Sequence, residues 1–296
     1  MPLITIPGGI ALEYETHGSG SDPPVLMVMG FASQLVAWPR DFCAQLAQGG
    51  RHVISFDNRD CGLSEKLDGI DARVGEVSAA ASAGNFEMAR ALAPYTLADM
   101  AADGFGLLTA LGIEQAHIVG VSMGGMIVQT MAIEHPERVL TLTSMMSTTG
   151  EPAYGQSTPE ALQGLLAPAA SDRDGYIASA DIWALWRSKR YPELDQARAI
   201  AAESFDRCYY PEGAKRHLAA VVASPPRTSG LARLRVPTLV IHGLDDTLIA
   251  PSGGERTAEL VPDAQLLLIE DMGHDRPSPL RPRICQAILE HTAAAA

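Results

Sequence analysis

The chain of 296 residues is 47% hydrophobic and 19% charged, which is typical of a folded globular protein and excludes an intrinsically disordered one. At this length, folding can bury about three quarters of the surface of the unfolded chain, so we expect a large core. The formal net charge of −13 opposes binding to phosphate backbones and to anionic membrane surfaces, so we expect neither a nucleic acid nor a membrane as partner.

In the first half of the chain, short apolar runs alternate with stretches that have the apolar spacing of helices. The runs predict strands at residues 10–17, 25–29, 52–56, 116–121 and 139–144, the first of them in an opening hairpin. The spacing predicts helices at residues 38–47, 97–111 and 124–135. Because strands that alternate with helices form mostly parallel sheets covered on both faces, this half predicts an α/β fold.

The alternation stops between about residues 148 and 233 and then returns. Within this stretch the sequence predicts helices near residues 159–166, 177–186, 194–208 and 213–223. After it, we expect strands at residues 237–243 and 265–269, and helices at residues 254–260 and from residue 281 onward. The sequence therefore predicts a core formed by residues 1–147 and 234–296, with residues 148–233 inserted as an all-helical cap.

Cysteine usage and the N-terminal residues bear on the cellular compartment. Four cysteines lie far apart without a C-x-x-C pair, which predicts free thiols and neither a disulfide framework nor a zinc site. The first residues have neither the basic leader nor the apolar stretch of a secretion signal, and no apolar run reaches the roughly 18 residues of a membrane span. We therefore expect a cytoplasmic protein with no metal and no other cofactor.

The pentapeptide Gly120-Val121-Ser122-Met123-Gly124 interrupts an apolar run. It fits the pattern G-x-S-x-G, in which a sharp turn from a strand to a helix exposes a serine hydroxyl as a nucleophile. The glycines two residues before and after Ser122 remove side chains that would collide where the chain reverses. The alternative is a glycine-rich connection whose serine lies on the surface without a chemical role.

A serine hydroxyl needs a base to remove its proton, and the base needs an orienting carboxylate. Among the eight histidines, His274 follows the last predicted strand, where a loop can return toward Ser122. The strand before it ends in a turn with two acids, and an acid there completes the order serine, aspartate, histidine that this chemistry uses. Only one of the adjacent aspartates is expected to face the imidazole, and we favour Asp246. The alternatives are a structural role for His274 and the orienting role for Asp245, which we otherwise expect to cap the turn.

At these three positions the sequence resembles the α/β-hydrolase family. The segment His242-Gly243-Leu244-Asp245-Asp246 is similar to the family's H-G-x-x-D pattern, and Gly273-His274 is similar to its G-H pattern. Residues 56–64 are similar to its D-x-R-G-x-G-x-S turn, with Asp60 in place of the first glycine. The resemblance implies a mostly parallel eight-stranded sheet with helices on both faces and a helical cap. Residues 28–50 and 56–66 look like the esterase branch that includes aclacinomycin methylesterase, which implies hydrolysis of carboxylic esters.

The resemblance also implies an oxyanion hole made of two backbone donors. In the family, one donor follows the glycine after the third strand and the other follows the nucleophile, which assigns the N–H groups of Phe31 and Met123. Met29 stands where many members have a histidine. Because both donors belong to the main chain, this departure need not damage the hole.

Large apolar side chains near these segments are candidates for a substrate pocket between the sheet and the insertion. The candidates are Trp38, Met145, Met146, Trp183 and Trp186. Trp183 and Trp186 are three residues apart, so the alternative is that they pack the insertion onto the sheet. The two interpretations are compatible.

These observations predict a serine hydrolase that cleaves a small-molecule carboxylic ester through an acyl-enzyme intermediate, as a monomer or homodimer. A lactonase, a thioesterase, a carbon–carbon bond hydrolase or a cofactor-free perhydrolase would use the same three residues. The fold also serves ligand-binding receptors. Haloalkane dehalogenases and epoxide hydrolases of this fold need an aspartate at the position of Ser122, so the sequence excludes them.

Overall fold

The computed structural model describes residues 2–294; residues 1, 295 and 296, at the outer ends of the predicted core segments, lie outside the described residues. In this range, eight strands form one sheet in the order β1-β2-β4-β3-β5-β6-β7-β8. All neighbours run parallel except β1 with β2 and β2 with β4. The strands are β1 (Leu3–Thr5), β2 (Ala11–His17), β3 (Pro24–Val28), β4 (His52–Phe56), β5 (Ala116–Val121), β6 (Val139–Met145), β7 (Thr238–Gly243) and β8 (Gln265–Ile269). The predicted fold class, with its mostly parallel eight-stranded sheet, is therefore confirmed.

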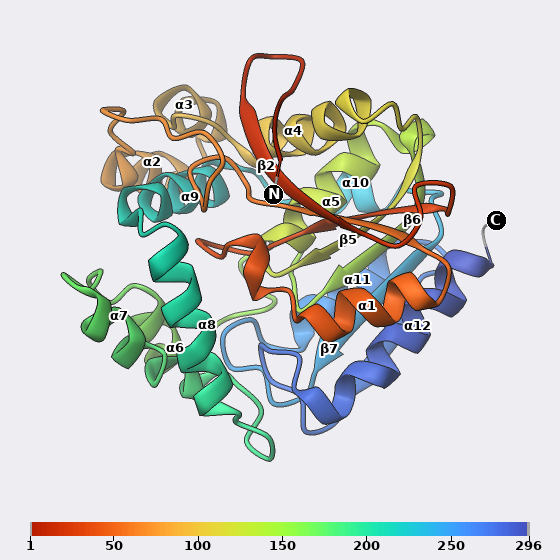
Figure 1. Ribbon diagram of the computed structural model, residues 1–296. Helices are drawn as coiled ribbons and strands as arrows, with labels where there is room; N and C mark the ends of the chain where they lie inside the picture. Colours follow the sequence, from red (N-terminus) through yellow and green to blue (C-terminus); the bar gives the residue numbers. More distant parts are fainter. Residues whose placement is uncertain (1, 295–296) are drawn as a thin grey trace.

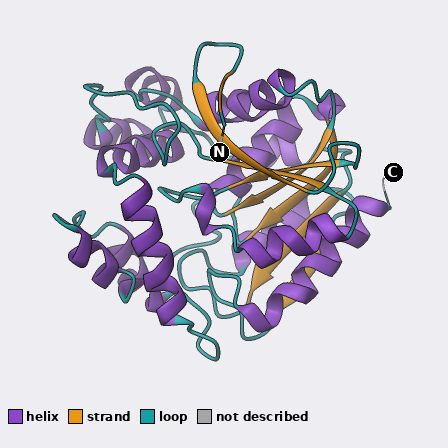
Figure 2. Cartoon of the chain, in the orientation of Figure 1, coloured by secondary structure: helices purple, strands orange, loops and turns teal. Residues whose placement is uncertain are grey.

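Helices cover both faces of the sheet (Figures 1 and 2). One face packs against α1 (Arg40–Gln48) and α12 (Arg281–Ala293), and the other against α4 (Leu97–Ala110), α5 (Met123–Glu134), α10 (Thr228–Leu231) and α11 (Ser252–Leu260). The central strand β5 shows why its sequence is continuously apolar. Ile118 belongs to the core cluster on one face and Val119 to the cluster on the other, and both are fully buried.

A mostly helical segment connects β6 to β7. It contains α6 (Pro159–Leu165), α7 (Arg173–Ser179), the 3-10 helix η3 (Ile182–Leu185), α8 (Leu194–Arg207) and α9 (Pro211–Ala223), followed by α10. Figure 1 shows α6, α7 and α8 apart from the sheet, in green and teal. The single helix predicted over residues 177–186 is wrong in detail, because α7 starts earlier, at the Asp172 cap, and the chain turns at Ala180, which is buried against α8. The division into core and cap at residues 148 and 233 stays a prediction.

Two helices that the sequence analysis did not predict lie between β4 and α4. They are α2 (Val74–Ser82) and α3 (Phe86–Leu92), and both pack on α9. The shared cluster is built largely from small residues, among them Ala89, Ala219 and Ala223. Among residues 2–294, no helix is long and apolar enough to cross a membrane.

Candidate active site

Ser122 lies where β5 turns into α5, with φ 58° and ψ −122°. Few residues other than glycine adopt a positive φ, so this backbone is strained. A Cβ atom on Gly120 would overlap the carbonyl oxygen of Gly124, and one on Gly124 would overlap the carbonyl oxygen of Val28. The chain can therefore make this turn only with glycine at both positions, and the turn holds Ser122 at the carboxyl end of the central strand.

The loop after β3 passes directly beside Ser122. A Cβ atom on Gly30 would lie 3.1 Å from the Cβ of Ser122, so only a glycine fits here without displacing its neighbour. The next residue, Phe31, and the first residue of α5, Met123, each present a backbone N–H that donates no hydrogen bond within residues 2–294. The two N–H groups predicted as oxyanion donors are thus on the two segments that flank Ser122.

Asp246 and His274 are in direct contact. Oδ2 of Asp246 lies 2.7 Å from Nδ1 of His274, and Oδ1 accepts hydrogen bonds from the N–H groups of Leu248 and Ile249, both at 2.9 Å. The imidazole Nε2 of His242 lies 3.4 Å from Oδ2. Burial alone would raise the pKa of Asp246, but the charges of His274 and His242 and their hydrogen bonds to the carboxylate lower it to about 2. Asp246 therefore stays ionised beside the imidazole of His274.

Ser122 and His274 both line one cavity of about 600 Å³. Its wall combines residues of the sheet edge with residues of the helical segment between β6 and β7. The predicted site residues found in the wall are Ser122, His274, Phe31, Met123, Met146, Trp183 and Trp186. A cavity of this size is within the range of pockets that enclose small organic molecules.

Sequence comparison places the chain among proteins of known fold. The family described as alpha/beta hydrolase fold matches residues 23–275, which is most of the chain. The chain belongs to the alpha/beta hydrolase fold family. Rhodomycin D methylesterase DauP of Streptomyces sp. (strain C5) is 29% identical, over 97% of this chain and 96% of that protein.

Two solved structures extend the comparison. A thermophilic esterase from Thermogutta terrifontis is 26% identical with a TM-score of 0.74, covering 99% of this chain and 98% of that chain. The enol-lactonase from Burkholderia xenovorans LB400 is 21% identical with the same TM-score of 0.74, covering 99% of this chain and 100% of that chain. The likeness to the lactonase shows the shared alpha/beta hydrolase fold alone.

Two residues predicted for the pocket lie instead in the core. Trp38 is 2% exposed and stacks on Phe42 with ring centroids 5.9 Å apart, while the guanidinium of Arg276 lies 4.8 Å from its ring centroid. Met145 is fully buried in the same core cluster as Phe42. Both residues are close to the site along the chain, but their side chains fill the layer between the sheet and the helices α1 and α12, and neither lines the cavity.

In this alpha/beta hydrolase, residues 186–188, which follow η3, are bonded to the loop that carries His274. The N–H of His274 donates to the carbonyl oxygen of Trp186 at 2.6 Å. The neighbouring Asp275 accepts a hydrogen bond from the N–H of Ser188 at 3.1 Å and lies 3.4 Å from Nε of Arg187. Nothing in the sequence pattern pointed to these contacts, because they join residues about 87 positions apart.

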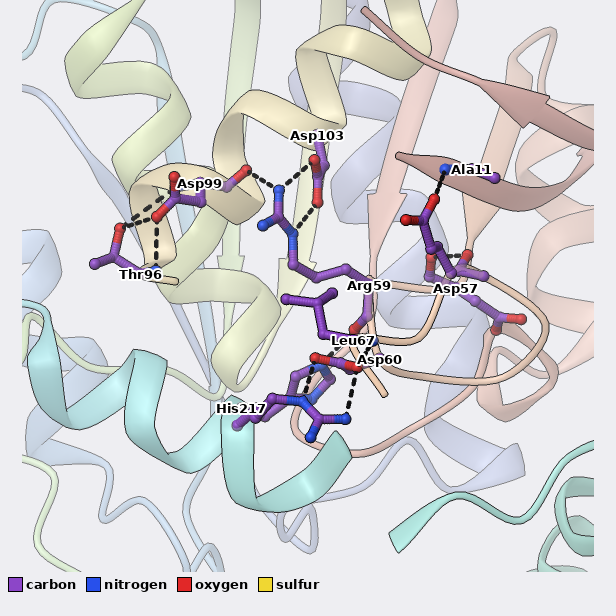
Figure 3. Close-up of polar contacts among 12 residues, drawn as sticks. Ala11, Asp57, Arg59, Asp60, Leu67, Thr96, Asp99, Asp103 and His217 are labelled. Carbon is purple, nitrogen blue, oxygen red and sulfur yellow. Dashed lines mark hydrogen bonds and ion pairs between the residues drawn. The ribbon is translucent and has the colours of Figure 1, made fainter. Parts of the chain in front are cut away.

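The turn after β4 anchors the helical segment through two ion pairs. Asp57 lies 2.6 Å from Nη1 of Arg207 on α8, and Asp60 lies 2.8 Å from Nε of Arg216 on α9. Asp60 has φ 62°, which fits the glycine that the family pattern has at this position. Figure 3 shows Asp60 and Arg59 of this turn on opposite sides of the chain, with Arg59 reaching Asp103. Asp60 was the one sequence signal for this anchor, since it breaks the family pattern.

Among the described residues, no group of three or more His, Cys, Asp or Glu side chains is arranged to hold a metal ion.

Proposed function

We propose that the protein is a carboxylic ester hydrolase in which Ser122, His274 and Asp246 act as nucleophile, general base and orienting acid. The observation that carries the proposal is the shared cavity of Ser122 and His274, together with the 2.7 Å contact between His274 and Asp246. A serine in a strained turn beside an imidazole that an ionised carboxylate orients is the arrangement that activates a hydroxyl for attack.

In the proposed mechanism, the contact with Asp246 leaves Nε2 of His274 free to act as the base. Nδ1–H donates to the carboxylate of Asp246, so Nε2 is the nitrogen that takes the proton of the Ser122 hydroxyl. Attack on the ester carbonyl forms a tetrahedral intermediate, and its collapse releases the alcohol with the proton from Nε2. Water then attacks the acyl-enzyme, with His274 again as base, and releases the acid.

The developing oxyanion is stabilised by the N–H groups of Phe31 and Met123. Both flank Ser122, and neither donates to another group within residues 2–294. Loss of one such donor typically lowers turnover by about 10²–10³-fold, so their placement adds substantially to the rate that the triad provides.

The substrate we propose is an ester of a small alcohol with a bulky, largely apolar acid. The cavity of about 600 Å³ leaves room for a large acyl group, and its wall includes aromatic side chains such as Trp183, Tyr176 and Tyr209. The similar Streptomyces protein is named for a methylesterase activity, which supports a methyl ester.

A fluorophosphonate probe and an ester panel test this function. We expect the probe to label Ser122, and we expect Ser122→Ala to abolish labelling and to lower turnover by about 10⁶-fold if chemistry is rate-limiting. The panel should hold the methyl alcohol constant while the acid grows from acetate to a polycyclic aromatic acid, with a lactone, a thioester and a carbon–carbon substrate beside it. If the protein turned over only the lactone, the thioester or the carbon–carbon substrate, that activity would replace the ester assignment. If the probe labelled Ser122 but no substrate was turned over, a receptor would be favoured.

A further inference from the structure

His217 lies outside the catalytic residues proposed above but touches the loop that carries Phe31. It is on α9, fully buried, and both of its ring nitrogens have partners. Nδ1 lies 3.2 Å from the backbone N of Ala32, and Nε2 lies 2.8 Å from the carbonyl oxygen of Arg59. Figure 3 shows His217 beside Asp60 and the turn that follows β4.

These two partners determine the tautomer of His217. A backbone N–H can only donate, so Nδ1 must accept from Ala32, and a carbonyl oxygen can only accept, so Nε2 must carry the proton. His217 is therefore neutral. Burial agrees with this, because it lowers the pKa of the imidazole, and the nearby carboxylate of Asp60, which raises the pKa, does not outweigh it. In a protonated ring Nδ1 also carries a hydrogen, so two N–H donors would face each other and the hydrogen bond from Ala32 could not form.

The contact falls on a strained and exposed part of the loop. Ala32 has φ 51°, in the left-handed region that is unfavourable for residues other than glycine. Ala32 is itself exposed, whereas the ring that accepts its N–H is fully buried. The imidazole of His217 also packs edge-on against the ring of Phe31, with centroids 6.3 Å apart.

We propose that His217 is a positioning residue. It accepts from the Ala32 N–H and packs on the Phe31 ring, and so holds the backbone on the far side of Phe31 in place, so that the Phe31 N–H in the preceding peptide points to the oxyanion beside Ser122. The inference rests on the proposed function, which gives the Phe31 N–H its role. The anchor for His217 is the turn after β4, through the carbonyl of Arg59 and through the adjacent ion pair of Arg216 with Asp60. The helical segment then sets the geometry of the oxyanion loop through His217.

Two amide substitutions separate positioning from mere packing. Asparagine places its amide where Nδ1 of the histidine lies, so the amide oxygen of His217→Asn can still accept from the Ala32 N–H. Glutamine places its amide where Nε2 lies, so the NH₂ group of His217→Gln can donate only to the Arg59 carbonyl. We expect His217→Gln to lower kcat by about 10–100-fold with KM within about threefold, because small displacements of a reacting group cost about that much. We expect His217→Asn to recover most of that loss.

Two measurements do not depend on turnover. Hydrogen exchange of the Ala32 amide should be slow in the wild-type protein and in His217→Asn, and fast in His217→Gln. In the wild-type protein alone, histidine ¹⁵N chemical shifts should show Nδ1 of His217 unprotonated near neutral pH, which keeps the test intact if a variant does not fold.

The outcomes are distinct. Equal kcat values for the two variants, fast exchange at Ala32 in the wild-type protein, or a protonated Nδ1 would each overturn the positioning role. Failure of the wild-type protein to hydrolyse any ester would instead contradict the proposed function, and the exchange and ¹⁵N measurements would still decide whether His217 holds Ala32.

Discussion

Oδ2 of Asp246 lies 2.7 Å from Nδ1 of His274, although Asp245 is its immediate neighbour in the chain. Asp246 is 4% exposed, and both of its carboxylate oxygens accept hydrogen bonds. The side chain of Asp245 is half-buried and forms no hydrogen bond or ion pair among the described residues. The two adjacent carboxylates are therefore in different environments, and only one of them can stabilise an imidazolium at His274.

This relationship predicts unequal effects of two matched substitutions. We expect Asp246→Asn to lower kcat by about 10⁴-fold, because an amide leaves His274 without a charge partner and in the wrong tautomer. We expect Asp245→Asn to change kcat by less than about threefold. Steady-state kinetics on the best ester of the panel, with circular dichroism as a folding control, provide the measurement. A larger loss for Asp245→Asn would remove Asp246 from the proposed mechanism.

The sequence predicted well what depends on local pattern. The bounds of β4 and β5 agree with the predicted strands to the residue, because continuous apolar runs with clear turn signals define buried strands. The strained conformation of Ser122 was likewise implied by the spacing of two glycines. These features are set within a few residues, so one sequence is enough to find them.

What the sequence did not predict depends on contacts between distant segments. Trp38 was placed in the pocket because it is near Phe31 in the chain, but whether its ring faces the cavity or the core is decided by α1 and by Arg276. His217 contacts Ala32 across 185 residues and showed no motif of its own. Such side chains carry no periodic signal, so only the folded arrangement shows what they touch.

The ion pair between Asp60 and Arg216 gives a prediction about stability. Both side chains are almost fully buried, and removing one partner leaves the other as an uncompensated buried charge. We expect Arg216→Met to lower the free energy of unfolding by about 3–5 kcal/mol, measured by urea denaturation at pH 7.

The double variant Asp60→Gly with Arg216→Met is the matched control. Glycine relieves the positive φ of residue 60 and removes the stranded carboxylate, so we expect the double variant to be more stable than Arg216→Met alone. If the losses of unfolding free energy in Asp60→Gly alone and Arg216→Met alone added up to the loss in the double variant, the two side chains would not be energetically coupled.

His117 predicts a dependence of stability on pH. Its side chain is 1% exposed on β5, with Nδ1 at 2.9 Å from Oγ1 of Thr141, and burial lowers its pKa from 6.5 to about 4. The unfolded chain therefore binds a proton below pH 6.5 that the folded protein does not bind until about pH 4. Stability from this group is complete above pH 6.5 and is lost as the pH falls toward 4.

The comparison of wild-type protein with His117→Asn isolates this effect. At about 1.4 kcal/mol per pKa unit, the titration of His117 should lower the free energy of unfolding of the wild-type protein by about 2 kcal/mol between pH 7 and pH 5. Asparagine keeps a polar group near Thr141 but does not titrate, so the variant should lose about 2 kcal/mol less over the same interval. Urea unfolding at the two pH values measures the difference, and parallel losses in both proteins would contradict the lowered pKa.

Trp38 and Trp183 should separate stability from substrate selection, because one fills the core and the other lines the cavity. We expect Trp38→Ala to lower the free energy of unfolding by about 3–5 kcal/mol, as for other large-to-small core changes, with little change in the relative kcat/KM of the ester panel. Trp183→Ala removes an aromatic wall, so we expect kcat/KM for the bulkiest methyl ester to fall by about tenfold relative to methyl acetate, with a smaller loss of stability. If Trp38→Ala shifted the preference among esters as strongly as Trp183→Ala, the prediction would be wrong. The indole of Trp38 would then contact the substrate and could not remain stacked on Phe42. Because both variants are compared within one panel, a general loss of active protein cancels and only the contact with the acyl group remains.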